Sequence, residues 1–198
     1  MRNTLLICVA VWYFASCGTP AGEETATATR DLVSLALTDR GVLCSETYTD
    51  IDWYLKQSKA PVFDGLDVLH YPITTSSEEA QRYFDQGLAW AWGFNHAEAA
   101  RSFYEAMRQD PDCAMCHWGF AYVLGPNYNA GMEPDNFERA YDAIQKAVEL
   151  GSNASDKEQA LIAAMAARYG MPAPEDRSAL DIAYSEALKQ VYDQYPED

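Results

Sequence analysis

The chain has 198 residues, of which 48% are hydrophobic and 13% aromatic, so it can build a packed core and is not a disordered polypeptide. Its formal net charge is −16 and its pI is about 4.4. Such acidity excludes nucleic-acid binding through bulk electrostatics, because the chain repels phosphate backbones.

The N-terminus has the features of an export signal. Arg2 gives a positive start, and residues 5–14 form an apolar run that is too short to span a bilayer. The run leads into the sequence FASC at residues 14–17, which resembles the lipobox of bacterial lipoproteins. That resemblance implies cleavage after residue 16 and a lipid on Cys17, so the signal peptide is 1–16. A plain secretory peptide with an unmodified cysteine is the alternative.

Between the signal and the helical region lie two further segments. Gly18, and not Asp, follows the cysteine, so the lipoprotein resemblance implies sorting to the outer membrane of a Gram-negative cell. Residues 17–30 are rich in Gly, Thr, Ala and Glu and are expected to form a flexible tether. Residues 31–74 are expected to form an N-terminal extension with a short helix near 50–57, and Pro and Gly interrupt the remainder.

From residue 75 onward the sequence predicts helices and no strands, so the expected fold class is all-α. Two Ser-containing sequences, at 76–79 and 155–158, have the spacing of capping boxes. The loop at 125–129 is the best candidate for a functional loop, although its asparagines could simply satisfy turn backbone. Helices are predicted from the 76–79 box to Trp92 and over 96–109, 113–124, 137–150, 155–169 and 175–195.

Small residues alternate with bulky ones at fixed intervals in this region. The positions are Gly87, Ala99, Phe103, Ala106 and Pro111, followed by Ala121, Ala140, Ile144 and Ala147. Their spacing resembles the tetratricopeptide (TPR) repeat, a helix-turn-helix unit of 34 residues. The loop at 125–134 can absorb the longer interval between the two sets. The sequences at 93–99 and 110–116 also resemble a bacterial subgroup of unassigned function whose members are longer. We therefore expect the domain at 75–195 to continue beyond this sequence.

The TPR resemblance implies stacked helix pairs in an α-α superhelix, because a small residue at a helix crossing allows the backbones to approach. It also implies an inner face on which a protein or peptide partner would bind. The absence of Lys and Arg there argues against a clamp for a terminal carboxylate and favours an apolar segment. The alternative is that residues 50–58 fill this face and make it core. The expected inner-face residues are Gln81, Phe84, Leu88, Trp92, Met115, Trp118 and Tyr122.

A second interpretation comes from the sequence CAMCH at 113–117. It matches the attachment pattern of c-type haem, in which Cys113 and Cys116 form thioethers and His117 is an axial ligand. A disulfide or a redox-active thiol pair are the alternatives in an oxidising compartment. Cys44 is left without an assigned role. Candidates for a sixth haem ligand are Met132, Met165, His70 and His96.

Motifs for catalysis are absent from the sequence. It contains no phosphate-binding glycine loop, no Gly-x-Ser-x-Gly and no His-Glu-x-x-His, and no second ligand pair accompanies the cysteines for zinc. We therefore expect a non-enzymatic scaffold without a cofactor, attached to the membrane only through its N-terminal lipid. An electron-transfer cytochrome, a thiol-disulfide redox protein, or an enzyme domain in a missing C-terminal portion are the alternatives.

Overall fold

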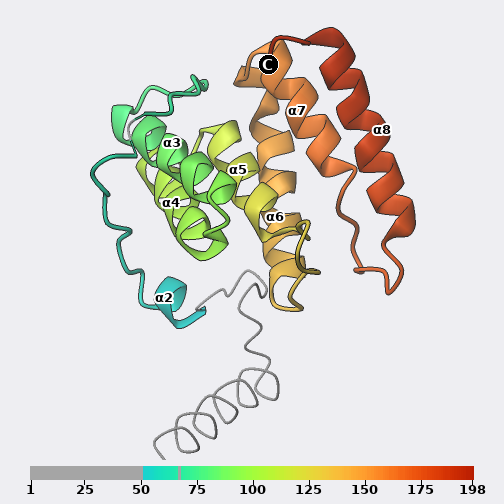
Figure 1. The fold of residues 1–198 in the computed structure, drawn as a ribbon, viewed down its shortest axis with the longest axis horizontal. Helices are drawn as coiled ribbons and strands as arrows, with labels where there is room; N and C mark the ends of the chain where they lie inside the picture. Colours follow the sequence, from blue (N-terminus) through green and yellow to red (C-terminus); the bar gives the residue numbers. More distant parts are fainter. Residues whose placement is uncertain (1–50, 67) are drawn as a thin grey trace, which may run out of the picture. The chain divides into compact units, whose positions relative to one another are not determined.

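The computed structural model describes residues 51–66 and 68–198, and all regular structure in these residues is helical (Figure 1). The expected signal peptide, the tether, Cys17 and Cys44 lie outside the described residues. The all-α fold class is confirmed. The helices are α2 (Ile51–Leu55), α3 (Glu78–Trp92), α4 (His96–Gln109), α5 (Ala114–Leu124), α6 (Asn136–Leu150), the 3₁₀ turn η1 (Gly151–Asn153), α7 (Asp156–Ala166) and α8 (Ser178–Gln194).

Local capping explains where several helices begin. The Ser155 side chain accepts from the Glu158 N–H while the Glu158 carboxylate accepts from the Ser155 N–H, so this predicted capping box is confirmed. The other predicted box is wrong. The N-cap of α3 is Ser77, which accepts from the Ala80 N–H, and three residues after the cap there is an alanine and no glutamate. Helix α3 therefore has the hydrogen bond from the N-cap side chain but lacks the reciprocal bond that completes a capping box.

Consecutive helices pack on one another from α3 to α8, an arrangement consistent with an α-α superhelix of stacked pairs (Figure 1). The turns between α3 and α4 and between α4 and α5 are short, so these neighbours run antiparallel. None of the helices in residues 51–66 and 68–198 combines the length and apolarity that a bilayer crossing requires.

The crossing of α3, α4 and α5 is built around the ring of Phe103. A Cβ atom added at Gly87 would lie 2.7 Å from this ring, and one added at Gly119 would lie 2.4 Å from it. Both glycines therefore leave the space that the ring fills, and any side chain there would overpack the core. The other small positions of the predicted pattern are also fully buried: Ala99, Ala106, Ala121, Ala140 and Ala147.

The array is less tightly packed at its C-terminal end. Helix α8 packs on α7, yet Val191 is its only buried residue. It begins at Ser178, three residues later than predicted, after a segment that contains Pro172 and Pro174.

Candidate functional site

The structure divides the expected inner face into a core half and an exposed half. Phe84, Leu88 and Met115 are buried, so they pack inside the array and do not form a free surface. Trp92 is exposed. Gln81, Trp118 and Tyr122 are half-buried. The rings of Trp118 and Tyr122 stack with centroids 5.3 Å apart. The sequence could not separate these halves, because burial depends on which later helices and loops pack on each turn.

The segment that lies beside the buried half is also different from the expected one. Residues 50–58 were the candidate filler, but α2 packs through Tyr54 against Tyr104 and Phe120, on α4 and α5. Near the buried half lies Tyr71, whose ring centroid is 6.3 Å from that of Phe84. The prediction that residues 50–58 fill the inner face is therefore wrong, because the residue of the extension that packs beside Phe84 is Tyr71.

Two of the expected inner-face residues, Trp92 and Tyr122, line a cavity of about 440 Å³ that we call the aromatic pocket. It forms where α3 and α5 end and α4 begins, and α8 closes one side of it. Three of the aromatic residues that line it are exposed to solvent: Trp92 at 58%, Phe94 at 63% and Tyr128 at 97%. The side chains that shape it belong to Trp92, Phe94, His96, Tyr122, Tyr128, Arg168 and Tyr184.

Residues of the candidate loop at 125–129 line the pocket, and Arg168 holds this loop through hydrogen bonds to its backbone. Arg168 donates to the backbone carbonyls of Tyr122, at 3.2 Å, and of Pro126. Its guanidinium also lies 4.9 Å from the ring centroid of Tyr184. Since the arginine is engaged in this way, it fixes the loop and does not offer a free charge. Asn127 accepts from the Asn129 and Ala130 N–H groups, so the turn-forming role considered for that asparagine is confirmed.

Gly125 starts this loop at a point of close approach. A Cβ atom there would lie 2.4 Å from the Tyr169 hydroxyl oxygen and 2.6 Å from Nη1 of Arg168. The Tyr169 hydroxyl donates to the Ala121 carbonyl at 2.5 Å, and burial raises the pKa of Tyr169 to about 12. The phenol is therefore a neutral donor, and only glycine leaves room for it beside the loop.

His96 is a polar residue in the lining of the pocket. Neither of its ring nitrogens has a hydrogen-bond partner in residues 51–66 and 68–198, although both atoms are buried. Burial lowers the pKa of His96 below 6.5, so the ring is neutral at physiological pH and carries one donor and one acceptor. A buried pair of this kind costs free energy unless something binds to it.

Phe94 was missed by the sequence analysis, as were the contributions of Arg168 and Tyr184. Phe94 has a φ of +61°, in the left-handed region that bulky residues rarely occupy. Such a residue costs roughly 1–3 kcal/mol and persists where the surroundings or the function require it. The sequence signal was its position directly after Gly93, between two helices, where glycine or asparagine is usual.

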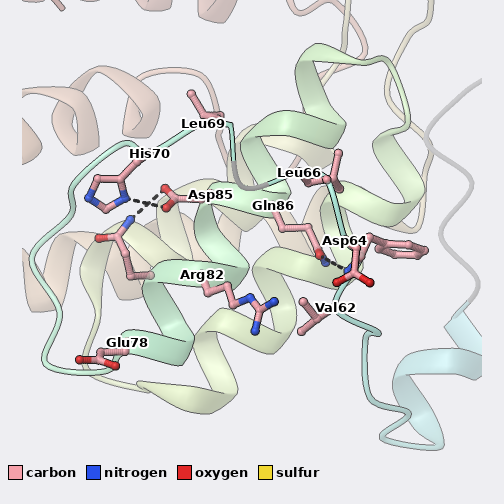
Figure 2. Close-up of a pocket in the computed structure, with 12 residues that line it drawn as sticks. Val62, Asp64, Leu66, Leu69, His70, Glu78, Arg82, Asp85 and Gln86 are labelled. Atoms are coloured by element: carbon pink, nitrogen blue, oxygen red, sulfur yellow. Dashed lines mark hydrogen bonds and ion pairs between the residues drawn. The ribbon is translucent and has the colours of Figure 1, made fainter.

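A second cavity, of about 580 Å³, lies between α3 and the segment 60–75, which we call the strap (Figure 2). Figure 2 shows Asp85 pointing toward His70, and the two side chains are 2.8 Å apart. Asp85 also accepts from the Tyr71 N–H and from Gln81. The buried amide of Gln86 bonds to three strap or core atoms: the Phe63 N–H, the Pro61 carbonyl and the Ser102 hydroxyl. These buried groups are satisfied within the protein, so they attach the strap and leave no unmatched atom for a ligand.

The CAMCH segment forms a disulfide between Cys113 and Cys116, with an S–S distance of 2.15 Å. Both cysteines are buried, and the Cys113 sulfur caps α5 by accepting from the Cys116 N–H. His117 Nε2 lies 3.0 Å from the Pro111 carbonyl. These residues do not fit a haem, because the sulfurs are bonded to each other inside the helix packing and the imidazole is directed at a backbone oxygen. Burial equally prevents an incoming thiol from reaching the sulfurs, so the structural reading of the pair is favoured.

Other metal chemistry has no residue cluster to support it in the described part of the chain, which contains no group of three or more His, Cys, Asp or Glu side chains placed to hold an ion. The remaining sixth-ligand candidates are dispersed. Met165 is fully buried, and His70 is held by Asp85.

Comparisons with known proteins add nothing to this geometry. No family model, no curated protein and no solved structure matches the chain. The function must therefore be inferred from the aromatic pocket and its chemistry.

Proposed function

We propose that the chain is an exported, lipid-anchored scaffold of stacked, TPR-like helix pairs that binds a protein or peptide segment in the aromatic pocket. The observation that carries the proposal is the combination of exposed aromatic walls with a buried imidazole that has no partner among the described residues. Aromatic side chains that are exposed around a concave site are typical anchors of recognition surfaces.

The walls define the apolar part of the ligand. An apolar side chain inserted between Trp92 and Tyr184 would bury surface on both partners, and full burial of one large apolar side chain stabilises by roughly 1.5–3 kcal/mol. No carboxylate of the residues that the structure describes lines the cavity, and Arg168 is bonded to two carbonyls. The part of the ligand that enters the pocket is therefore uncharged.

His96 defines the polar part of the ligand. A neutral imidazole offers one N–H donor and one acceptor nitrogen, and a backbone amide offers the complementary pair. A peptide bond next to the inserted side chain would satisfy both nitrogens. This match favours a peptide over a hydrocarbon ligand, which would leave the imidazole unsatisfied.

A selection experiment tests this function. The full chain is immobilised and used to select from a random peptide library, and enriched peptides are measured by calorimetry. We expect the peptides to share an aromatic or branched apolar residue, and Trp92→Ala to weaken binding roughly tenfold or more, as loss of an interface anchor does. Tyr192→Ala, which removes an equally exposed aromatic on α8, is the matched control. Enrichment of peptides that bind the Trp92→Ala variant unchanged would refute the proposed site.

The anchor is tested separately. In a Gram-negative host that expresses the full chain, radiolabelled palmitate should be incorporated and lost in Cys17→Ser. The unsubstituted chain should fractionate with the outer membrane. Incorporation that persists in Cys17→Ser would show that the lipid is not on Cys17. Absence of label in both proteins would leave secretion without a lipid as the surviving interpretation.

A further inference from the structure

A third cavity, of about 460 Å³, lies between α2, α4, α5 and α6, and we call it the α2 pocket. It shares no lining residue with the aromatic pocket. Its size falls in the usual range for small-molecule sites. Its chemistry is that of a different ligand class, and the inference drawn from it is independent of the proposed peptide binding.

One side of the α2 pocket is aromatic. The rings of Tyr54 and Tyr104 meet edge to face with centroids 5.0 Å apart, and the ring of Phe120 lies 5.7 Å from that of Tyr104. Such a wall provides apolar contact area for a hydrocarbon chain or ring system.

Two cations, Arg139 and Lys146, also line this pocket. The guanidinium of Arg139 lies 4.3 Å from the ring centroid of Tyr54, and its Nη2 is buried without a hydrogen-bond partner in the described residues. The ammonium of Lys146, 3.1 Å from Glu149, also lines the cavity, and Asp142 is the only carboxylate among the lining residues that the structure describes. In a chain with a formal charge of −16, this pocket reverses the prevailing sign. Its balance of charges suits one negative charge on the ligand.

His117 supplies a further unmatched group. It lines the cavity, is 8% exposed, and its Nδ1 has no hydrogen-bond partner in residues 51–66 and 68–198. Nε2 must carry the ring proton, because the Pro111 carbonyl 3.0 Å away can only accept. Burial lowers the pKa of His117, so the ring is neutral and Nδ1 presents a lone pair. That lone pair requires a donor, which a hydroxyl group can provide.

From these three features we infer that the α2 pocket binds a small amphipathic hydroxycarboxylate. Its carboxylate pairs with Arg139 and Lys146, its hydroxyl donates to Nδ1 of His117, and its apolar body lies on the aromatic wall. The unmatched Nη2 of Arg139 and the unmatched Nδ1 of His117 are then both satisfied, each by the group whose polarity complements it.

Calorimetry on the full chain with three probes tests this inference. The probes are 3-hydroxydecanoate, decanoate and decylamine, which share an alkyl chain and differ in head group. We expect 3-hydroxydecanoate to bind more tightly than decanoate, and decylamine not to bind. Arg139→Gln should weaken the binding of both carboxylate probes roughly tenfold or more, since a hydrogen bond to a charged group is lost. His117→Phe should remove the difference between the two carboxylates.

Matched variants make the test decisive. Arg101→Gln removes another arginine that lies over an aromatic ring, 5.7 Å from the centroid of Trp53, but outside the pocket, and it should leave all affinities unchanged. If Arg139→Gln fails to fold by circular dichroism, the half-exposed Lys146→Gln takes its place and must weaken carboxylate binding. Equal binding of decylamine, or unchanged carboxylate affinity in these folded variants, would overturn the inference.

Discussion

The strap and the aromatic pocket differ in whether their buried polar groups have hydrogen-bond partners. Along the strap, Asp85, Gln86 and Glu158 are buried and each accepts hydrogen bonds from strap atoms. In the aromatic pocket, both nitrogens of His96 are buried and lack partners within the described residues. A satisfied buried group contributes to stability, whereas an unsatisfied one costs roughly 1–3 kcal/mol. The difference indicates that the strap stabilises the fold, and it supports the proposal that the aromatic pocket binds a ligand.

Glu158 shows how far this matching goes on the strap side. Its carboxylate accepts from the N–H and hydroxyl of Thr74, at 2.6 and 2.5 Å, and from the N–H and hydroxyl of Ser155, at 2.7 and 2.8 Å. One side chain therefore caps α7 and fixes the end of the strap. Burial alone would raise the pKa of Glu158, but these four hydrogen bonds outweigh it and hold the pKa below 4.5.

Removal of this carboxylate should have the largest effect on stability. Glu158→Ala leaves four donors unmatched, and we expect it to lower the free energy of unfolding by about 3 kcal/mol, measured by urea denaturation. Glu149→Ala removes an exposed glutamate paired with Lys146 and should change the free energy of unfolding by less than about 0.5 kcal/mol. Peptide affinity should be unchanged in both. A strap that contributed nothing would give two equal, small effects.

A substitution at Gly125 should affect both stability and binding. Gly125→Ala forces a methyl group against Tyr169 and Arg168, so we expect a loss of about 2 kcal/mol in unfolding free energy and a weaker peptide complex. Gly131→Ala is the matched control, because no atom lies within 4 Å of its added Cβ. Thermal unfolding and calorimetry of the two variants compare them directly. Equal behaviour of the two alanines would mean that the loop is not held as described.

Acid should weaken the strap by a smaller amount. Because the pKa of Glu158 is lowered by folding, its contribution is complete above about pH 4.5 and is lost as the pH falls through the lowered value. Urea denaturation between pH 7 and pH 3 should therefore show a decline below pH 4.5 that is shallower in Glu158→Gln. Parallel pH curves for the two proteins would contradict this assignment.

The smallest effect is expected at His96, and it has the opposite sign. His96→Phe replaces two unmatched nitrogens with carbon, so we expect a gain of up to about 1 kcal/mol in unfolding free energy. The gain should be larger at pH 5 than at pH 8, because folding lowers the pKa of His96 and the wild-type chain loses stability as the pH falls below 6.5. Peptide binding should weaken roughly tenfold. A variant that loses stability would show that the imidazole has a structural partner.

Much of the fold could be predicted because its signals are local. Asn95 and Asp110 border a helix whose two ends, at His96 and Gln109, were both predicted correctly. Gly87 and Phe103 were identified by spacing, and they meet in the core. Gly119, the other side of the same contact, was not identified, because a single glycine inside an apolar helix has no periodic signal.

The candidate site was predictable only in fragments. Trp92, Tyr122 and the 125–129 loop were identified, but the sequence gives no sign that Arg168 and Tyr184 join them. These two residues come from the end of the array where the small-residue pattern fades. Likewise, the bond between Asp85 and the Tyr71 N–H joins positions that share no motif, so the strap could not be anticipated. Contacts of this kind arise from tertiary packing, which a local pattern does not encode.

The central claim is that a peptide completes the hydrogen bonds of His96. The most direct measurement is the ¹⁵N NMR spectrum of the histidine rings in the full chain, with and without a selected peptide, assigned with His96→Phe. Binding should shift the ring nitrogens of His96 toward hydrogen-bonded values and leave those of His70, which already bonds to Asp85, unchanged. A bound peptide that leaves the His96 signals in place would contradict the account.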